Sequence, residues 1–188
     1  MAPLDPDTAR TRLLDAAEDL FYARGIQAVG MDDIRGGSGV SLKRLYSLYP
    51  AKEQLVEAYL QRRDVRWRGR LAAFVEQVDD PRERVLAVFD WLGTWFREPG
   101  FRGCAWINGH GELGATSDVV ARLAREHKLA FADYVAGLVR EAGLPEALAP
   151  QVFLLAEGAM VAAGILGTDA PAAQAHAAAE VLVSSFAA

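Results

Sequence analysis

The chain has 188 residues, which suits one large domain or a small domain joined to a larger one. Hydrophobic residues make up 52% of it, so it can bury a sizeable core and is expected to fold rather than stay disordered. The net charge of −5 excludes a uniformly basic protein, but residues 1–70 carry a net +2 and residues 71–188 a net −7. We therefore expect a slightly basic N-terminal part and an acidic remainder.

No segment of the sequence is expected to span a membrane or to act as a secretion signal. The most apolar run, residues 153–167, is interrupted by Glu157 and is shorter than the roughly 20 residues that a span requires. The N-terminus lacks the basic-then-apolar order of a signal peptide. The single Cys104 has no disulfide partner within the chain, which suits a reducing compartment. These features predict a cytoplasmic protein.

Helical spacing dominates the chain from its first residues, and no convincing series of strands is present. Leu13, Ala17 and Phe21 share one face of a first helix that is expected to begin near Asp7. Gly25 follows where a left-handed C-terminal cap would end this helix.

Residues 33–55 predict two short helices, a tight turn at residues 39–41 between them, a stop at Pro50 and a long helix opening at Lys52. Two short helices joined by a glycine-containing turn form a helix-turn-helix unit, whose second helix is shaped to lie in the DNA major groove. An apolar frame would hold the two helices together, formed by Ile34, Val40, Leu45 and Leu48. This stretch therefore predicts DNA binding.

Five side chains of the second short helix stay outside that frame: Leu42, Lys43, Arg44, Tyr46 and Ser47. Lys43, Arg44 and Ser47 are candidates for reading base edges, since Lys and Arg pair well with guanine. The alternative is an exposed polar helix face with no role in recognition. Tyr46 is expected to point outward with its hydroxyl near a phosphate, whereas Tyr49 is expected to pack against the first helix.

The rest of the chain predicts further helices. One runs from Lys52 toward Val78, the next ends before Pro99, and a later one is capped by Thr116 or Ser117. Two more follow over residues 150–166 and 171–186, whereas residues 101–114 are harder to assign because four glycines weaken a helix there. The prediction is an all-α protein of about nine helices, with a helix-turn-helix DNA-binding domain at 1–55 and a helical body at 56–188.

Residues 10–60 resemble the tetracycline-repressor (TetR) family of bacterial regulators. The resemblance rests on spaced motifs: Ala16-Ala17-x-x-Leu20-Phe21, Asp33-Ile34, Gly39-Val40-Ser41 and Leu45-Tyr46-x-x-Tyr49-Pro50-x-Lys52-Glu53. It implies an all-helical homodimer whose heads bind a near-palindromic operator in double-stranded DNA, with repression relieved by a small-molecule effector in the body. By position, Lys43, Arg44, Tyr46 and Ser47 would lie on the recognition helix, and Lys52 would contact a phosphate.

Three departures from the family pattern bear on the second helix of the head. Gly36 and Gly37 stand where small helix-favouring residues are usual, and together they weaken the helix by about 1–2 kcal/mol relative to alanine. Arg35 falls where two helices of the family normally approach closely, so it must lean outward or force them apart. Gly30 replaces the usual capping Ser or Thr. We therefore predict a soft second helix that is poorly ordered without DNA.

Several other patterns have plain structural explanations. The arginine run 62–70 leads away from the head, so a solvated face with ion pairs is expected. Residues 109–114 match G-x-G-x-x-G but lack the βαβ context of a dinucleotide site, so a kinked helix or a flexible pocket wall is expected. Cys104 has no evident activating neighbour. No metal site, catalytic residue or cofactor is predicted.

Aromatic side chains and polar groups on apolar faces suggest an effector pocket in the body, with plain core as the alternative. The candidates are Trp91, Trp95, Phe96, Trp106, Asn108, His110, His127, Tyr134, Glu157 and Met160. Small residues dominate the last two helices, which favours them as the homodimer surface over tight packing within one chain. Two rivals remain: a regulator whose body docks a partner protein, and a ligand carrier or enzyme with a degenerate head.

Overall fold

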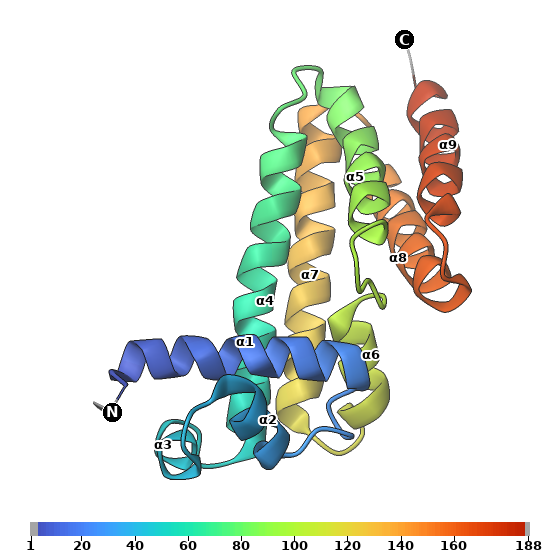
Figure 1. Ribbon diagram of the computed structural model, residues 1–188. Helices are drawn as coiled ribbons and strands as arrows, with labels where there is room; N and C mark the ends of the chain where they lie inside the picture. The colour runs from blue at the N-terminus through green and yellow to red at the C-terminus, as the bar shows by residue number, and fades with distance from the viewer. Residues whose placement is uncertain (1–3, 187–188) are drawn as a thin grey trace. The chain divides into compact units, whose positions relative to one another are not determined.

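The computed structural model describes residues 4–186, which form nine α-helices and contain no strand (Figure 1). The helices are α1 (Pro6–Arg24), α2 (Met31–Ser38), α3 (Leu42–Leu48), α4 (Lys52–Val75), α5 (Pro81–Phe96), α6 (Ala105–Leu113), α7 (Asp118–Glu141), α8 (Leu148–Leu166) and α9 (Ala170–Ser184). The expectation of an all-α chain of about nine helices is confirmed.

The chain divides into two compact units, each assembled from two separate stretches. Unit 1 contains the residues up to Asp64 together with residues 105–124, and unit 2 contains residues 65–104 together with those from Arg125 onward. The long helices α4 and α7 each contribute residues to both units. The division of the sequence into domains at 1–55 and 56–188 stays a prediction.

In unit 1, helix α1 begins slightly earlier than its spacing suggested. The Asp5 carboxylate caps it by accepting hydrogen bonds from the backbone N–H groups of Asp7 (3.1 Å) and Thr8 (3.0 Å). At the other end Gly25 adopts φ 89° and ψ 151°, so the expected left-handed helical cap is wrong, although the Gly25 N–H still bonds to Phe21. The positive φ turns the chain away from the helix.

In unit 2, helices α5, α8 and α9 pack together through small residues (Figure 1). A Cβ atom added at Gly93 of α5 would lie 3.3 Å from the Cβ of Ala172 in α9. One added at Gly164 of α8 would lie 3.0 Å from the Cα of Gly103. Since a larger residue at either position would crowd the neighbouring backbone or helix, these glycines permit close packing.

Helix α8 begins at Leu148, slightly before the expected start at residue 150. By length and composition alone it is apolar enough to cross a membrane, with 19 residues and a mean hydropathy of 1.6. This is weak evidence for a span, because core helices of water-soluble proteins meet the same criteria. Ala156, Met160 and Ala163 lie on the face of α8 that is buried in unit 2.

Candidate functional site

The turn between α2 and α3 is held by local hydrogen bonds and a buried apolar frame. Gly39 takes a left-handed conformation (φ 65°), and its N–H donates to the carbonyl of Arg35 at 3.1 Å. The Ser41 hydroxyl caps α3 by accepting from the backbone N–H of Arg44 at 3.3 Å. Ile34, Val40 and Leu45 are buried as predicted, whereas Leu48 is half-buried.

Helix α3 turns most of its predicted DNA-binding side chains toward solvent. Leu42, Lys43, Tyr46 and Ser47 are exposed, while Tyr49, just after the helix, is buried as predicted. Arg44 is half-buried, and within the described residues its Nε atom has no hydrogen-bond partner. The Ser47 hydroxyl donates to the Arg44 carbonyl at 2.7 Å. While that bond is present, Ser47 can only accept a hydrogen bond from another group. The base-reading roles of these side chains stay predictions.

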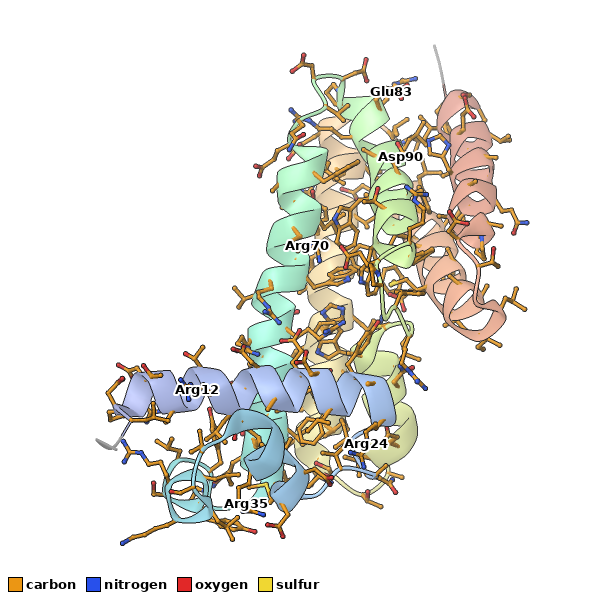
Figure 2. The ribbon with its side chains drawn as sticks, in the orientation of Figure 1. Arg12, Arg24, Arg35, Arg70, Glu83 and Asp90 are labelled. Atoms are coloured by element: carbon orange, nitrogen blue, oxygen red, sulfur yellow. The ribbon has the colours of Figure 1, made fainter. Side chains whose placement is uncertain are left out.

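Helix α2 approaches α1 at Gly37, and Arg35 leans outward, which is one of the two outcomes expected for it. A Cβ atom at Gly37 would lie 3.3 Å from the Ala16 Cβ and 3.5 Å from Leu20. Arg35 lies on the side of α2 that faces away from α1 and pairs with Asp32 at 3.2 Å (Figure 2). Arg35 therefore neither forces the helices apart nor enters the contact between them.

The N-terminus of α2 is stabilised by a carboxylate that was not predicted. The Asp33 carboxylate accepts from the backbone N–H of Gly30 at 2.8 Å, which is half of a capping box. That hydrogen bond and the guanidinium of Arg24, 3.3 Å away, lower the pKa of Asp33. An acidic residue three positions after the N-cap is the signal in the sequence that points to this cap.

Lys52 opens α4, as predicted, but its side chain is only half-exposed. Its ammonium lies 5.9 Å from the centroid of the Phe21 ring. Desolvation lowers the pKa of Lys52, and the negative charges of Glu112 and Asp33 oppose this shift. A phosphate placed near Lys52 would, like these two carboxylates, favour the protonated form of its side chain. Its phosphate-binding role stays a prediction.

Helix α6 packs within unit 1 against the loop that joins α1 and α2. The Glu112 carboxylate accepts from the backbone N–H of Gln27 at 2.8 Å, and the Gln27 side chain donates to the Glu112 carbonyl. A Cβ atom at Gly109 would lie 3.3 Å from Ile26, so this glycine permits the helix to approach the loop. The G-x-G-x-x-G stretch, residues 109–114, thus includes the end of a helix packed against this loop and forms no phosphate loop.

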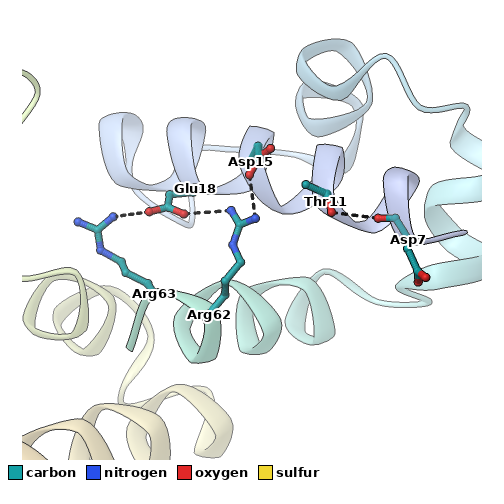
Figure 3. Close-up of polar contacts among 6 residues, drawn as sticks. All are labelled: Asp7, Thr11, Asp15, Glu18, Arg62 and Arg63. Atoms are coloured by element: carbon teal, nitrogen blue, oxygen red, sulfur yellow. Dashed lines mark hydrogen bonds and ion pairs between the residues drawn. The ribbon is translucent and has the colours of Figure 1, made fainter. Parts of the chain in front are cut away.

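Two arginines of the basic run join α4 to α1 through one carboxylate. Glu18 accepts from Arg62 at 3.0 Å and from Arg63 at 2.9 Å, and Arg62 also bonds to Asp15 at 2.8 Å (Figure 3). Arg63 additionally lies 4.0 Å from the centroid of the Tyr22 ring. The expected ion pairs are present, but the expected solvated face is wrong for Arg62 and Arg63, whose side chains are largely buried.

Trp67, on the same basic run, is the centre of a buried aromatic cluster in unit 2. Its ring centroid lies 4.9 Å from that of Trp91, 5.6 Å from Trp95, 5.1 Å from His127 and 5.2 Å from Phe131. Most of these rings pack edge to face, which is a favourable arrangement for aromatic side chains. The rings fill this region of unit 2. The cluster brings together three of the predicted effector residues, Trp91, Trp95 and His127.

The other predicted effector residues are spread over several environments. Phe96 and Met160 are buried in unit 2, and Glu157 pairs with Lys128 at 2.7 Å. In unit 1, Trp106 is buried, whereas Asn108 and His110 are exposed. Their common role in one pocket stays a prediction.

Tyr134 lines a hollow in unit 2 of about 340 Å³ together with Phe131 and Gly69. Burial raises the pKa of Tyr134 to about 12, so its hydroxyl keeps its proton at neutral pH and can donate a hydrogen bond. A second hollow of about 510 Å³ lies between α5 and α9 and contains none of the ten predicted residues.

Cys104 has a charged neighbour, contrary to expectation. The Lys128 ammonium lies 3.4 Å from the Cys104 sulfur and also bonds to Glu157. The thiol is buried. Because Lys128 lies 24 residues away in the sequence, this proximity had no local signal.

The helix-turn-helix within an all-helical chain defines a class of DNA-binding regulators, and comparison with known proteins narrows it. The family description "Bacterial regulatory proteins, tetR family" matches residues 13–59. The crystal structure of a TetR-family transcriptional regulator from Streptomyces coelicolor is 30% identical, covering 95% of this chain and 96% of that one, with a TM-score of 0.87. The chain belongs to the TetR family of transcriptional regulators.

Other relatives agree with this assignment. An uncharacterised helix-turn-helix transcriptional regulator of Mycobacterium tuberculosis is 32% identical over 124 residues, and the match covers 63% of this chain and 60% of that protein. The transcriptional activator FasR of Mycolicibacterium smegmatis is 36% identical over 93 residues, covering 47% of this chain and 42% of that protein. The chain thus spans less than two thirds of the length of these curated relatives.

Proposed function

We propose that this chain is a cytoplasmic, ligand-responsive transcriptional repressor that binds a near-palindromic operator as a homodimer. The observation that carries the proposal is α3, a short helix that buries Leu45 and exposes Lys43, Tyr46 and Ser47. A recognition helix must keep one face for the fold and leave the other for base edges. Lys52, at the start of α4, would add a phosphate contact.

Exposed apolar residues on α8 and α9 support dimerisation through these two helices. The large ones are Leu154, Val161, Ile165, Leu166 and Val181. Such a concentration of apolar side chains is typical of surfaces that another protein covers. Two copies joined there would hold two heads for half-sites about 34–36 Å apart, one turn of DNA.

The hollow beside Tyr134, which Phe131 of the aromatic cluster also lines, supports a small, largely apolar or aromatic effector in the body. Such a ligand would act by favouring one conformer of the dimer over another. It can shift that equilibrium only by its differential affinity for the two conformers, commonly worth about 1–3 kcal/mol.

The alternative from another class is a carrier or enzyme with a degenerate head, and Gly36 and Gly37 are the feature that favours it. The contact of Gly37 with α1 argues against this alternative. Packing accounts for Gly37 but not for Gly36, whose added Cβ atom would meet nothing within 4 Å.

Selection of bound duplexes from a random-sequence pool, followed by gel-shift titration over a range of salt concentrations, tests the proposal. We expect a near-palindromic consensus with two half-sites about one helical turn apart. Binding should weaken as salt rises, because phosphate contacts release counterions. Absence of any sequence-selective shift at every salt concentration would instead favour the carrier.

A further inference from the structure

Among the residues of unit 1 that the structure describes, two large apolar side chains are exposed, and both belong to α3. Leu42 is 38% exposed and Tyr46 is 45% exposed. The remaining large apolar side chains with comparable exposure all lie in unit 2: Val65, Leu129, Leu154, Val161, Ile165, Leu166, Val181 and Phe186. In unit 1, large apolar side chains are thus exposed on α3, whereas those described elsewhere in the unit are buried or half-buried.

Leu42 and Tyr46 form one apolar patch because residues four apart lie on the same face of a helix. The fold does not need them in its core, since Leu45 fills the buried position of α3. The patch begins at the first residue of α3, and Lys43, exposed beside it, carries a positive charge. An apolar patch next to a lysine complements a major groove that presents methyl groups beside hydrogen-bond acceptors, such as O6 and N7 of guanine.

We infer that Leu42 and Tyr46 contact the C5-methyl groups of thymines in each operator half-site. This inference rests on the proposed function. Thymine is the one DNA base that presents a methyl group in the major groove, where apolar side chains can read it. The N-terminal residues of a recognition helix are the ones that reach base edges, and Leu42 occupies that position. The Tyr46 ring can cover a methyl group while its hydroxyl meets a phosphate.

Replacing thymine by deoxyuridine tests the inference, because it removes one methyl group and leaves the base pairing unchanged. Starting from the selected operator, each thymine of a half-site is replaced in turn, and the dissociation constant is measured by fluorescence anisotropy. We expect one or two positions per half-site at which the wild type binds about fourfold more weakly for each lost methyl group.

Two variants assign the penalty to the patch. Leu42→Ala should reduce the deoxyuridine penalty at one position to less than about 1.5-fold, and Tyr46→Ala should do so at a neighbouring position. Leu129→Ala removes an equally large exposed side chain from unit 2 (54% exposed) and should keep both the affinity and the full penalty.

The outcomes separate this inference from the proposed function. If no duplex is selected, the proposed function fails before any thymine is replaced. If a selected operator binds tightly but tolerates deoxyuridine everywhere, the proposed function stands and the inference is overturned. The inference is also overturned if neither substitution in α3 changes the penalty.

Discussion

Gly36 and Gly37 are adjacent in the sequence but meet different surroundings. A Cβ atom at Gly36 would meet nothing within 4 Å, whereas one at Gly37 would lie 3.3 Å from Ala16. We expect Gly36→Ala to raise the free energy of unfolding by about 0.5–1 kcal/mol through helix propensity alone. Gly37→Ala should gain none of this, because the added methyl group crowds α1. Urea denaturation compares the two, and equal stabilisation of both variants would contradict the proposed helix contact.

Lys52 is expected to contribute affinity without sequence preference. Its charge would neutralise one phosphate, so Lys52→Ala should weaken binding to all duplexes alike and reduce the slope of log K against log salt by about 1. Lys43→Ala should instead change which operator is preferred, because its side chain would face base edges. Binding titrations at several salt concentrations measure both effects. A uniform loss in both variants would contradict this division of roles.

Several residue environments were unpredictable because they depend on contacts distant in the sequence. The ion pair of Arg62 with Glu18 spans 44 residues, and the hydrogen bond of Gln27 with Glu112 spans 85. Spacing within one helix says which side chains share a face, but not which other helix covers that face. The Asp33 cap is different, since an acidic residue three positions after an N-cap is a local signal in the sequence.

At the scale of elements, the junction of α1 and α4 depends on Glu18. Its side chain is 16% exposed and accepts hydrogen bonds from two arginines, of which Arg63 is 12% exposed. We expect Glu18→Gln to lower the free energy of unfolding by about 1.5–3 kcal/mol, because hydrogen bonds to charged groups are stronger than neutral ones.

Arg10→Gln is the matched control for the Glu18 variant. Its ion pair with Asp7 lies within α1, and the two side chains are 53% and 93% exposed. Exposed pairs contribute little, so the change should be roughly 0.5 kcal/mol or less. Chemical denaturation followed by circular dichroism measures both variants. Similar losses in the two would show that the burial of Glu18 has no special effect.

Helical periodicity predicted most elements, and capping side chains mark the start of some of them. The Ser117 hydroxyl accepts from the backbone N–H of Val120 at 3.3 Å, as its position before an apolar stripe suggested. Helix α6 could not be assigned from the sequence because its glycines reduce helix propensity, while the contacts that favour it come from the α1–α2 loop. The softness of α2 remains a prediction for hydrogen exchange, and strong protection of residues 34–38 in the free protein would contradict it.

At the scale of the whole molecule, the proposed dimer depends on the exposed apolar residues of α8 and α9. A charge placed there would have to be desolvated on association, so Leu154→Glu and Val181→Glu should give monomers. These monomers should keep the helical circular dichroism spectrum and lose operator binding. Leu129→Glu, on α7, provides the control and should remain dimeric. Sedimentation velocity measures the state of each variant, and intact dimers of both α8 and α9 variants would overturn the proposed interface.

The class of fold was accessible from the sequence because nearly every segment has helical spacing and the head has a fixed motif. The grouping of helices into compact units was not. Periodicity places a residue on a helix face, whereas Gly109 against Ile26 depends on three-dimensional packing between distant segments.

The discontinuity of unit 1 limits how this regulator can be modified. Because residues 105–124 cluster with the N-terminal residues up to Asp64, unit 1 is not formed by one continuous N-terminal segment. A fragment ending at Asp64 would lose the carboxylate of Glu112 that holds the loop before α2. A chimaera that joins this DNA-binding specificity to another effector-binding domain should therefore include both stretches. A chimaera that includes only the first stretch should have a less stable DNA-binding unit.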